Sequence, residues 1–133
     1  MLSVRTGYSI LATVLLTCTM AFSQTDLSPF VGVWEGDWER TSGPDQGATG
    51  KLVTTFALTD RKLVGSHYGI NVTKTDPEGR VVIFKHPYGS CEVKHTFTIS
   101  KSDPRKADST YQVDKCTPKE NNHTGKVHYT KQQ

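Results

Sequence analysis

Apolar and polar residues alternate with a period of two through most of the chain. The clearest example is CEVKHTFTIS at residues 91–100, where apolar residues and His95 occupy the odd positions while Glu, Lys, Thr and Ser occupy the even ones. This period predicts β-strands that bury one face. No segment shows helical periodicity longer than a turn or two, and a short turn is expected at residues 26–30.

The stretch FVGVWEGDWER at residues 30–40 fits a strand better than a helix. A helix would contain Gly32 and Gly36, each of which costs about 1 kcal/mol relative to alanine. In a strand, Trp34 and Trp38 share one face with both glycines, and the acidic residues share the other face. A glycine between indoles lets a ring or a second backbone approach closely. We therefore expect a strand with one aromatic face.

Other segments continue the pattern: residues 51–59, 63–73, 80–88, 91–100, 109–113 and 125–130. Short strands joined by tight turns, without helices, indicate an all-β fold. Between a sandwich and a barrel, we favour a small antiparallel up-and-down β-barrel of about 8 strands.

Two local expectations concern the strand at residues 63–73. Its alternation places Ser66 and Tyr68 inward and His67 outward. The sequence Asp76-Pro77-Glu78-Gly79 that follows is typical of a three-residue hairpin loop with a bulge. This turn would pair residues 63–73 with the next strand.

The N-terminal residues have the layout of a secretory signal peptide. Arg5 precedes an apolar run at residues 8–20, and Ala21-Phe22-Ser23 supplies a small-x-small cleavage signature. The run is shorter than the roughly 20 residues that a membrane span needs, and a lipid anchor on Cys18 is a minor alternative. We expect a signal peptide at residues 1–23 with cleavage after Ser23, a single β-barrel domain at residues 24–133, and a secreted or periplasmic location.

The charge of the chain argues against some partners. It contains 16 Lys and Arg residues against 13 Asp and Glu residues, and loss of Arg5 lowers the net charge to about +2. The charges are interspersed and form no basic run. We therefore expect no nucleic-acid partner and no membrane span beyond the leader.

Cys91 and Cys116 remain after the expected processing. An even pair in a secreted chain predicts a disulfide. Direct pairing of the two cysteines across a hairpin would set His95 opposite Gln112, whereas the alternation favours Tyr111 as its neighbour. One extra residue shortly before Cys116, a β-bulge, reconciles the two requirements.

Gly32-x-Trp34, with Phe30 just before it, resembles the G-x-W opening of the calycins, which include lipocalins, fatty-acid-binding proteins and avidins. The resemblance implies an up-and-down barrel in which the tryptophan closes one end. It also implies a basic residue from the last strand packed over the indole. Lys126 and Lys131 are the residues that would take this part here.

The residues expected to face inward are mostly aromatic. The interior of an eight-stranded barrel is just wide enough to be filled by side chains or to hold one small ligand. Aromatic walls with a few polar groups are typical of a small-molecule pocket, and also of a plain core. The leading hypothesis is a non-covalent carrier of an apolar or aromatic molecule, without a cofactor, through the ligand-binding residues Trp34, Trp38, Phe56, Ser66, Tyr68, Phe84, His95, Phe97, Tyr111 and Tyr129.

The histidines have no spacing that is typical of a metal site. His67, His86, His95, His123 and His128 include no pair at i, i+2 and no H-E-x-x-H motif, so we expect no metal. His67 and His128 are expected to point outward.

His95 itself is expected to bond a hydroxyl of Tyr68 or Tyr111. A lesser alternative is axial ligation of haem, because Gly32-x-Trp34-x-Gly36 resembles the start of small haem-binding barrels.

Enzyme chemistry is not expected, because the sequence has no G-x-S-x-G motif, no phosphate-binding glycine loop and no inward pair of carboxylates. The alternative to a carrier is an interaction protein, such as an inhibitor of an extracellular hydrolase that acts through a loop. The expected interaction loop is His86, Pro87 and Tyr88, held beside Cys91. Asn71 and Asn122 begin glycosylation sequons, which matter if the source is eukaryotic.

Overall fold

The structure is a computed structural model that describes residues 26–133, so the expected signal peptide lies outside the described residues. The described chain folds into nine strands and two short 3-10 turns, η1 (Ser28–Phe30) and η2 (Lys119–Asn121). The strands are β1 (Gly32–Ser42), β2 (Thr49–Thr59), β3 (Lys62–His67), β4 (Ile70–Asn71), β5 (Lys74–Glu78), β6 (Val81–Tyr88), β7 (Cys91–Ile99), β8 (Lys106–Asp114) and β9 (His123–Lys131).

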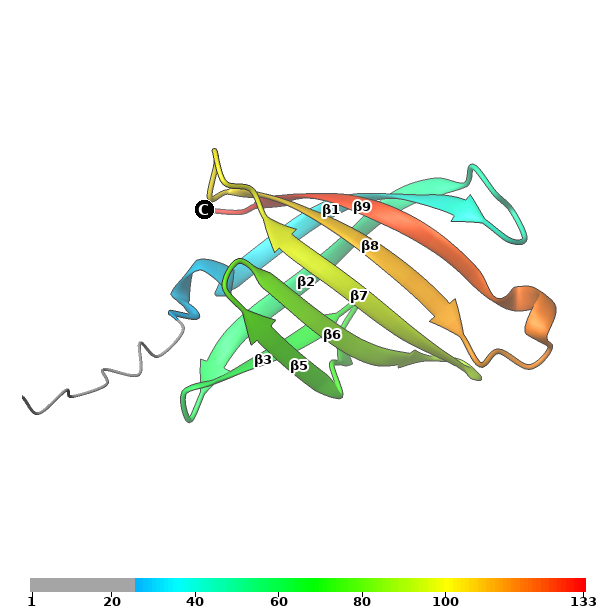
Figure 1. Cartoon of the computed structure of the whole chain (residues 1–133), viewed down its shortest axis with the longest axis horizontal. Helices are drawn as coiled ribbons and strands as arrows, with labels where there is room; N and C mark the ends of the chain where they lie inside the picture. The colour runs from blue at the N-terminus through cyan, green and yellow to red at the C-terminus, as the bar shows by residue number, and fades with distance from the viewer. Residues whose placement is uncertain (1–25) are drawn as a thin grey trace, which may run out of the picture.

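All nine strands belong to one antiparallel up-and-down sheet, in the order β4-β3-β2-β1-β9-β8-β7-β6-β5 (Figure 1). Pairing of β1 with β9 brings the two ends of the folded chain together in the middle of the sheet. The sheet is curled, and its two ends approach each other where Thr75 Oγ1 of β5 donates to the Leu63 carbonyl of β3 at 2.6 Å. The expected all-β, up-and-down architecture is confirmed, with nine strands instead of about eight.

The sequence assigned the wrong face to β3. Leu63 and His67 are buried, whereas Val64 is 43% exposed and Tyr68 58% exposed. Tyr68 and Gly69 both have positive φ, 52° and 71°, and form a two-residue turn between β3 and β4. Such a turn reverses the chain in the middle of what the alternation treated as one strand. The predicted alternation therefore continued through a turn. For the residues before the turn, it named as inward the residues that face outward.

The expected hairpin loop at Asp76-Pro77-Glu78-Gly79 is also wrong. Pro77 and Glu78 belong to β5 and pair with Val82 and Val81, so the turn lies at Gly79 and Arg80. β5 ends the strand order. Proline is tolerated there because an edge strand does not need every backbone N–H for the ladder.

The cysteine hairpin follows the sequence more closely. Cys91 and Cys116 form the expected disulfide. His95 lies opposite Tyr111, as expected, and regular pairing of β7 with β8 stops at Glu92 and Asp114. Lys115 then adopts a left-handed conformation, with φ of 58°. Cys91 is therefore bonded to the residue one position beyond its regular partner, which confirms the expected extra residue, and the ladder ends there without a bulge inside it.

Glycines on the inner face make room for rings on the neighbouring strand. At three of them a Cβ atom would overlap the facing ring, and at Gly65 it would come within 3.0 Å of Phe56. The expectation that glycine beside the tryptophans admits a ring is thus confirmed. The cross-strand pairs are Gly36 with Tyr129, Gly50 with Trp38, Gly65 with Phe56, and Gly125 with Tyr111.

One end of the interior is closed by Trp34. Its indole donates to the Phe30 carbonyl at 2.8 Å, and its ring meets Phe97 edge to face with centroids 5.0 Å apart. Lys131 of the last strand lies over the indole, with Nζ 5.4 Å from the ring centre. Lys131 rather than Lys126 therefore takes the position that the G-x-W resemblance implied.

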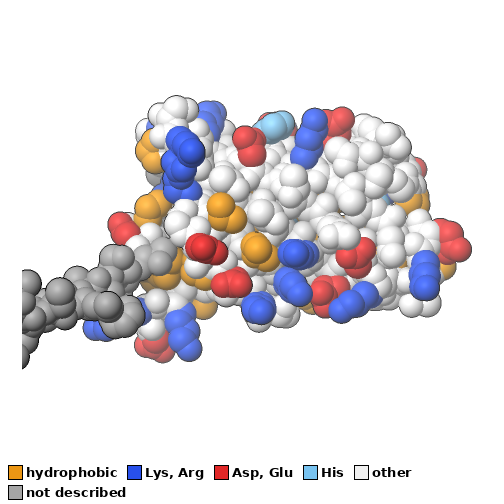
Figure 2. Space-filling view, viewed as in Figure 1, with side chains coloured by type: hydrophobic (Ala, Val, Ile, Leu, Met, Phe, Trp, Pro, Cys, Tyr) orange, Lys and Arg blue, Asp and Glu red, His pale blue; other side chains and the backbone are white. Residues whose placement is uncertain are grey.

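The outer surface is polar and mixed in charge. Figure 2 shows Lys and Arg side chains interspersed with Asp and Glu on the face in view. Lys126 and Glu39, for example, form an ion pair of 3.3 Å on neighbouring strands. Among the described residues no helix has the length and apolar character needed to cross a membrane.

Candidate functional site

A cavity of about 370 Å³ occupies the interior near the opposite end of β1 from Trp34. Its walls combine apolar and aromatic side chains with histidines and one arginine. The lining residues are Trp38, Arg40, Leu52, His67, Tyr68, Ile70, His86, Tyr88, Val93, His95, Tyr111, Val113 and His123. A volume of this order is within the range of small-molecule sites.

The positions of two aromatic rings help to keep this space open. Trp38 lies over Gly50 of β2, and Tyr111 lies over Gly125 of β9. Each ring occupies the place of a missing Cβ atom on the next strand, so it lines the wall and leaves the middle free.

The structure divides the ten residues expected to bind ligand. Trp38, Tyr68, His95 and Tyr111 line the cavity. The other aromatic residues, Trp34, Phe56, Phe84, Phe97 and Tyr129, are buried in the packed core. Ser66 is half-buried on β3 and does not line the cavity, because the face of that strand is reversed.

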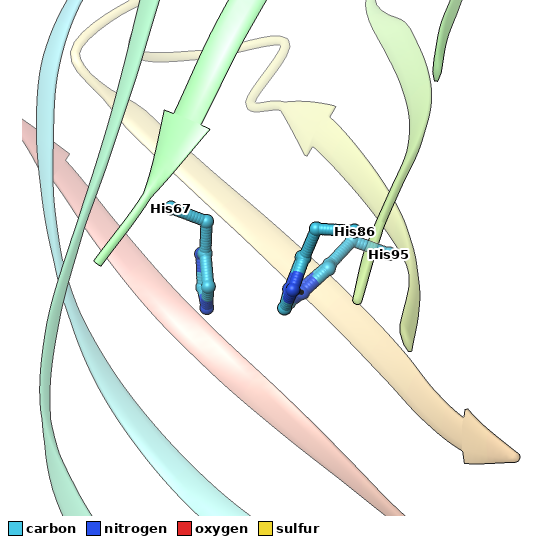
Figure 3. Close-up of side chains that lie close together, drawn as sticks. All are labelled: His67, His86 and His95. Atoms are coloured by element: carbon cyan, nitrogen blue, oxygen red, sulfur yellow. Dashed lines mark hydrogen bonds between the residues drawn. The ribbon is translucent and has the colours of Figure 1, made fainter. Parts of the chain in front are cut away.

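Three buried histidines meet at the cavity wall. His67 comes from β3, His86 from β6 and His95 from β7, and their exposed fractions are 5%, 3% and 2%. One ring nitrogen from each lies within 4.8 Å of the others. Figure 3 shows the His86 and His95 rings against each other, with His67 facing them from the other side. We call this set the histidine cluster.

Each histidine has a different polar neighbour. His67 Nδ1 lies 2.8 Å from Thr54 Oγ1, which lies 3.0 Å from the Tyr129 hydroxyl. His86 Nδ1 donates to the Pro87 carbonyl at 2.9 Å, and the Nε2 atoms of His86 and His95 are 2.9 Å apart. Nδ1 of His95 is buried and has no hydrogen-bond partner among the described residues.

Burial keeps the cluster neutral. Burial first, and then the neighbouring His86, lower the pKa of His67 to about 3. Burial also lowers the pKa of His86, against the opposing effect of the Pro87 carbonyl. The pKa of His95 is held well below its usual value by burial first, then by the neighbouring His67 and His86. At neutral pH the three rings therefore present unprotonated nitrogens.

Sequence reasoning missed this cluster for two reasons. His67 was expected outward because the alternation ran across the Tyr68–Gly69 turn. His86 was placed in an interaction loop, yet it lies inside β6 and is buried, which is a correction. The turn at Gly89 and Ser90 was the available signal, because a two-residue turn there sets Phe84 opposite His95 and brings His86 to the same face.

The cavity mouth carries mixed polar groups. Tyr68 and Tyr88 are 58% and 57% exposed, and the Tyr68 hydroxyl donates to the Lys51 carbonyl. Arg40 donates to the Pro44 carbonyl at 2.6 Å, but its Nε is buried without a hydrogen-bond partner in the described chain. No Asp or Glu is among the lining residues of residues 26–133. Arg40 is the fixed cation among these lining residues, and Asp45, which lies outside the lining, forms an ion pair with it at 3.8 Å.

The remaining histidines lie elsewhere. His123 reaches the cavity mouth and meets Tyr111 edge to face, with ring centroids 6.1 Å apart. His128 points outward, as expected, and lies 2.5 Å from Asp108.

Comparison with known proteins gives no assignment for this arrangement. No protein-family model, no curated protein and no solved structure matches the chain. Function must therefore be argued from the cavity and its residues.

Proposed function

We propose that this protein is a secreted small-molecule-binding protein that carries a non-covalently bound ligand with an apolar or aromatic body. The observation that carries the proposal is the cavity of about 370 Å³, lined by Trp38, Leu52, Tyr111 and other apolar side chains. Pockets of this size with apolar walls and a few polar groups are typical ligand sites. The Cys91–Cys116 disulfide is compatible with an oxidising, extracellular environment.

We further propose that the sheet works as a calycin-like barrel. Three observations support this: the hydrogen bond between β3 and β5 at the two ends of the sheet, the pairing of the first strand with the last, and Lys131 over Trp34 at the closed end. In such a barrel the packed end would serve as the floor. The ligand would enter between the exposed Tyr68 and Tyr88.

The lining also suggests the chemistry of the ligand. Arg40 is ion-paired with the exposed Asp45 at 3.8 Å, and its buried Nε has no hydrogen-bond partner among the described residues. A buried donor without a partner costs about 1–3 kcal/mol, and an acceptor on the ligand would recover part of this cost. A flat apolar body with a hydrogen-bond acceptor near Arg40 therefore fits the cavity best.

Binding can be tested with 8-anilinonaphthalene-1-sulfonate, an aromatic anion whose emission rises in apolar surroundings. The mature, disulfide-bonded protein should bind about one equivalent of this probe. Ile70→Trp places a bulky ring at the mouth and should weaken binding at least about 10-fold by occupying the pocket. Val64→Trp is the matched control, because Val64 lies on the outer face of the adjacent β3 and is 43% exposed.

Equal probe affinity in the wild type and the Ile70→Trp variant would contradict an interior site. Native mass spectrometry of protein collected from its own secretion route addresses the natural ligand. A retained adduct that is released on denaturation would support the carrier and give the mass of the ligand.

Two alternatives predict different results. A protein inhibitor would act through the exposed Tyr88 beside the disulfide, so inhibition of its target hydrolase would persist in the cavity-filling variant Ile70→Trp, whose probe binding is weakened. Haem ligation by His95 is less well supported, because its Nε2 already faces His86 Nε2 at 2.9 Å and an iron porphyrin would have to displace that ring. A Soret band on reconstitution would favour haem.

A further inference from the structure

The histidine cluster has a feature that small-molecule binding does not require. Three imidazoles from β3, β6 and β7 converge so that one nitrogen from each lies within 4.8 Å of the others. Burial of a polar side chain costs free energy unless it has partners, and here three adjacent polar side chains are buried together. A plain apolar core would be satisfied by leucine or phenylalanine at these positions.

The hydrogen bonds fix the tautomer of His86. A carbonyl oxygen only accepts, so the 2.9 Å contact with Pro87 requires the proton of the ring on Nδ1. In the neutral ring, Nε2 of His86 then carries a lone pair. This lone pair points at Nε2 of His95, 2.9 Å away.

The Nε2 atoms of His86 and His95 converge on each other. If His95 donates its Nε2 proton to His86, its Nδ1 is left as a bare acceptor, and this buried atom has no partner among the described residues. If the proton of His95 sits on Nδ1 instead, this atom is a buried donor that also has no partner in the described chain, and both Nε2 atoms then carry lone pairs. A cation between the rings would use both Nε2 lone pairs.

His67 completes a third side of the cluster. Its Nδ1 can donate a hydrogen bond to Thr54 Oγ1, and the Thr54 hydroxyl can in turn donate to the Tyr129 hydroxyl oxygen. That arrangement leaves a lone pair on Nε2 of His67. Histidines that bind metals usually donate their other ring N–H to an oxygen in this way, and His67 and His86 both have such an oxygen.

We propose that His67, His86 and His95 bind one divalent transition-metal ion, of the Zn²⁺ or Cu²⁺ class, with a fourth coordination position open to the cavity. Metal–nitrogen bonds of about 2.0–2.1 Å set tetrahedral donors about 3.3 Å apart. The observed spacings, 2.9 Å for His86 and His95 and at most 4.8 Å within the cluster, lie on either side of that value. Small side-chain rotations would therefore complete the site.

The donor set selects the class of ion. Imidazole nitrogens suit zinc, copper and nickel, whereas calcium and magnesium prefer oxygen ligands. No carboxylate lines the described cavity, and the cysteines at positions 91 and 116 are bonded to each other. Three neutral ligands leave the charge of the ion uncompensated. The open position should therefore take an anionic donor, hydroxide or an anionic group of a bound small molecule.

This inference stands apart from the proposed carrier function, and separate measurements test the two. Untagged, disulfide-bonded protein freed of metal with a chelator is titrated with Zn²⁺ by calorimetry. We expect one equivalent to bind. His67→Gln and His95→Gln should each lower the affinity at least about 100-fold, since losing a ligand exceeds the 10–100-fold cost of losing an outer partner. His128→Gln, at an exposed histidine, is the matched control.

A second measurement does not depend on the variants folding. In wild-type protein labelled with ¹⁵N, one equivalent of Zn²⁺ should shift the ring nitrogens of His67, His86 and His95 and leave those of His128 in place. Folded wild-type protein that binds less than one equivalent of both Zn²⁺ and Cu²⁺, or that shifts only His123 and His128, would overturn the proposal. The naphthalene probe, measured in chelator, reports on the cavity independently of the ion.

Discussion

The two ends of the interior use similar strands in different ways. At the packed end, Phe97 contacts Trp34 and Phe56 edge to face, with ring centroids 5.0 and 5.4 Å apart. Phe30, carried by the η1 turn before β1, adds a further ring 6.3 Å from Phe97. At the cavity end, Trp38 and Tyr111 lie over glycines instead of over each other, and no comparable turn inserts a ring.

This difference shows that a short segment outside the strands helps to determine which end is filled. The strands present inward side chains along their whole length, but η1 supplies a plug at one end only. The loop at the other end, which contains η2 (Lys119–Asn121), has no buried residue within that turn. The polar histidine cluster lies where the plug is missing.

Removal of a packed ring should give the largest effect on stability. Phe97→Ala deletes a side chain with contacts to four other rings, and should lower the free energy of unfolding by about 3–5 kcal/mol. Val113→Ala at the cavity end should cost only about 1.5 kcal/mol, the value of two methyl groups. Urea unfolding of both variants measures the contrast, and equal losses would show that the two ends are packed alike.

Loss of the disulfide tests how much the cavity end relies on covalent support. Cys91 and Cys116 are 25 residues apart, and a loop of that size predicts about 3.5 kcal/mol of stabilisation from the chain-entropy model. The double variant Cys91→Ser, Cys116→Ser should therefore unfold at lower urea. The affinity for the probe should fall, while Trp34 at the packed end should stay buried, because the bridge packs against the cavity-lining residues Val93 and Val113. Unchanged probe affinity in the folded double variant would show that the cavity does not depend on the disulfide.

Acid should act on the cavity end through the histidine cluster. The pKa of His67 is about 3 in the folded protein, while the unfolded value is about 6.5. Between these values the unfolded chain binds a proton that the folded chain does not, so stability is complete above pH 6.5 and falls as the pH is lowered. His86 and His95 shift in the same direction.

The contribution of His67 can be isolated by substitution. With chelator present, the stability lost between pH 7 and pH 5 should be about 2 kcal/mol smaller in His67→Gln than in the wild type. Urea unfolding at several pH values measures this difference. Identical pH profiles would mean that His67 takes up its proton over the same pH range in the folded and the unfolded chain.

The smallest effect is expected at the lysine above Trp34. Lys131→Ala removes a cation 5.4 Å from the indole centre and a hydrogen bond to the Pro29 carbonyl. A cation above an aromatic ring at a partly exposed site is worth about 0.5–1 kcal/mol. Lys126→Ala, whose partner is the exposed Glu39, is the control and should cost less. A larger loss of unfolding free energy in the Lys126→Ala control would contradict a stabilising contact between Lys131 and the Trp34 indole.

The cavity was only partly predictable from sequence. Trp38, His95 and Tyr111 were expected inward and line the cavity, but Trp34 and Phe97, which alternate in the same way, lie in the packed core. Period-two alternation gives the face of the sheet on which a side chain lies, and not its position along the length of the interior. The distinction between wall and core therefore depends on which residues meet across strands.

The sequence by itself determined the strand character, the up-and-down order, the disulfide and the extra residue before Cys116. These follow from local alternation, turn residues and the face requirement of a two-sided sheet. Only the tertiary structure decided that His67, His86 and His95 meet, because they lie on three strands and one of these was assigned to the wrong face. The physical reason is the tight turn at Tyr68 and Gly69, which sets His67 opposite Ile70. An alternation that is continued straight through this turn places the residues before it on the wrong face of the sheet.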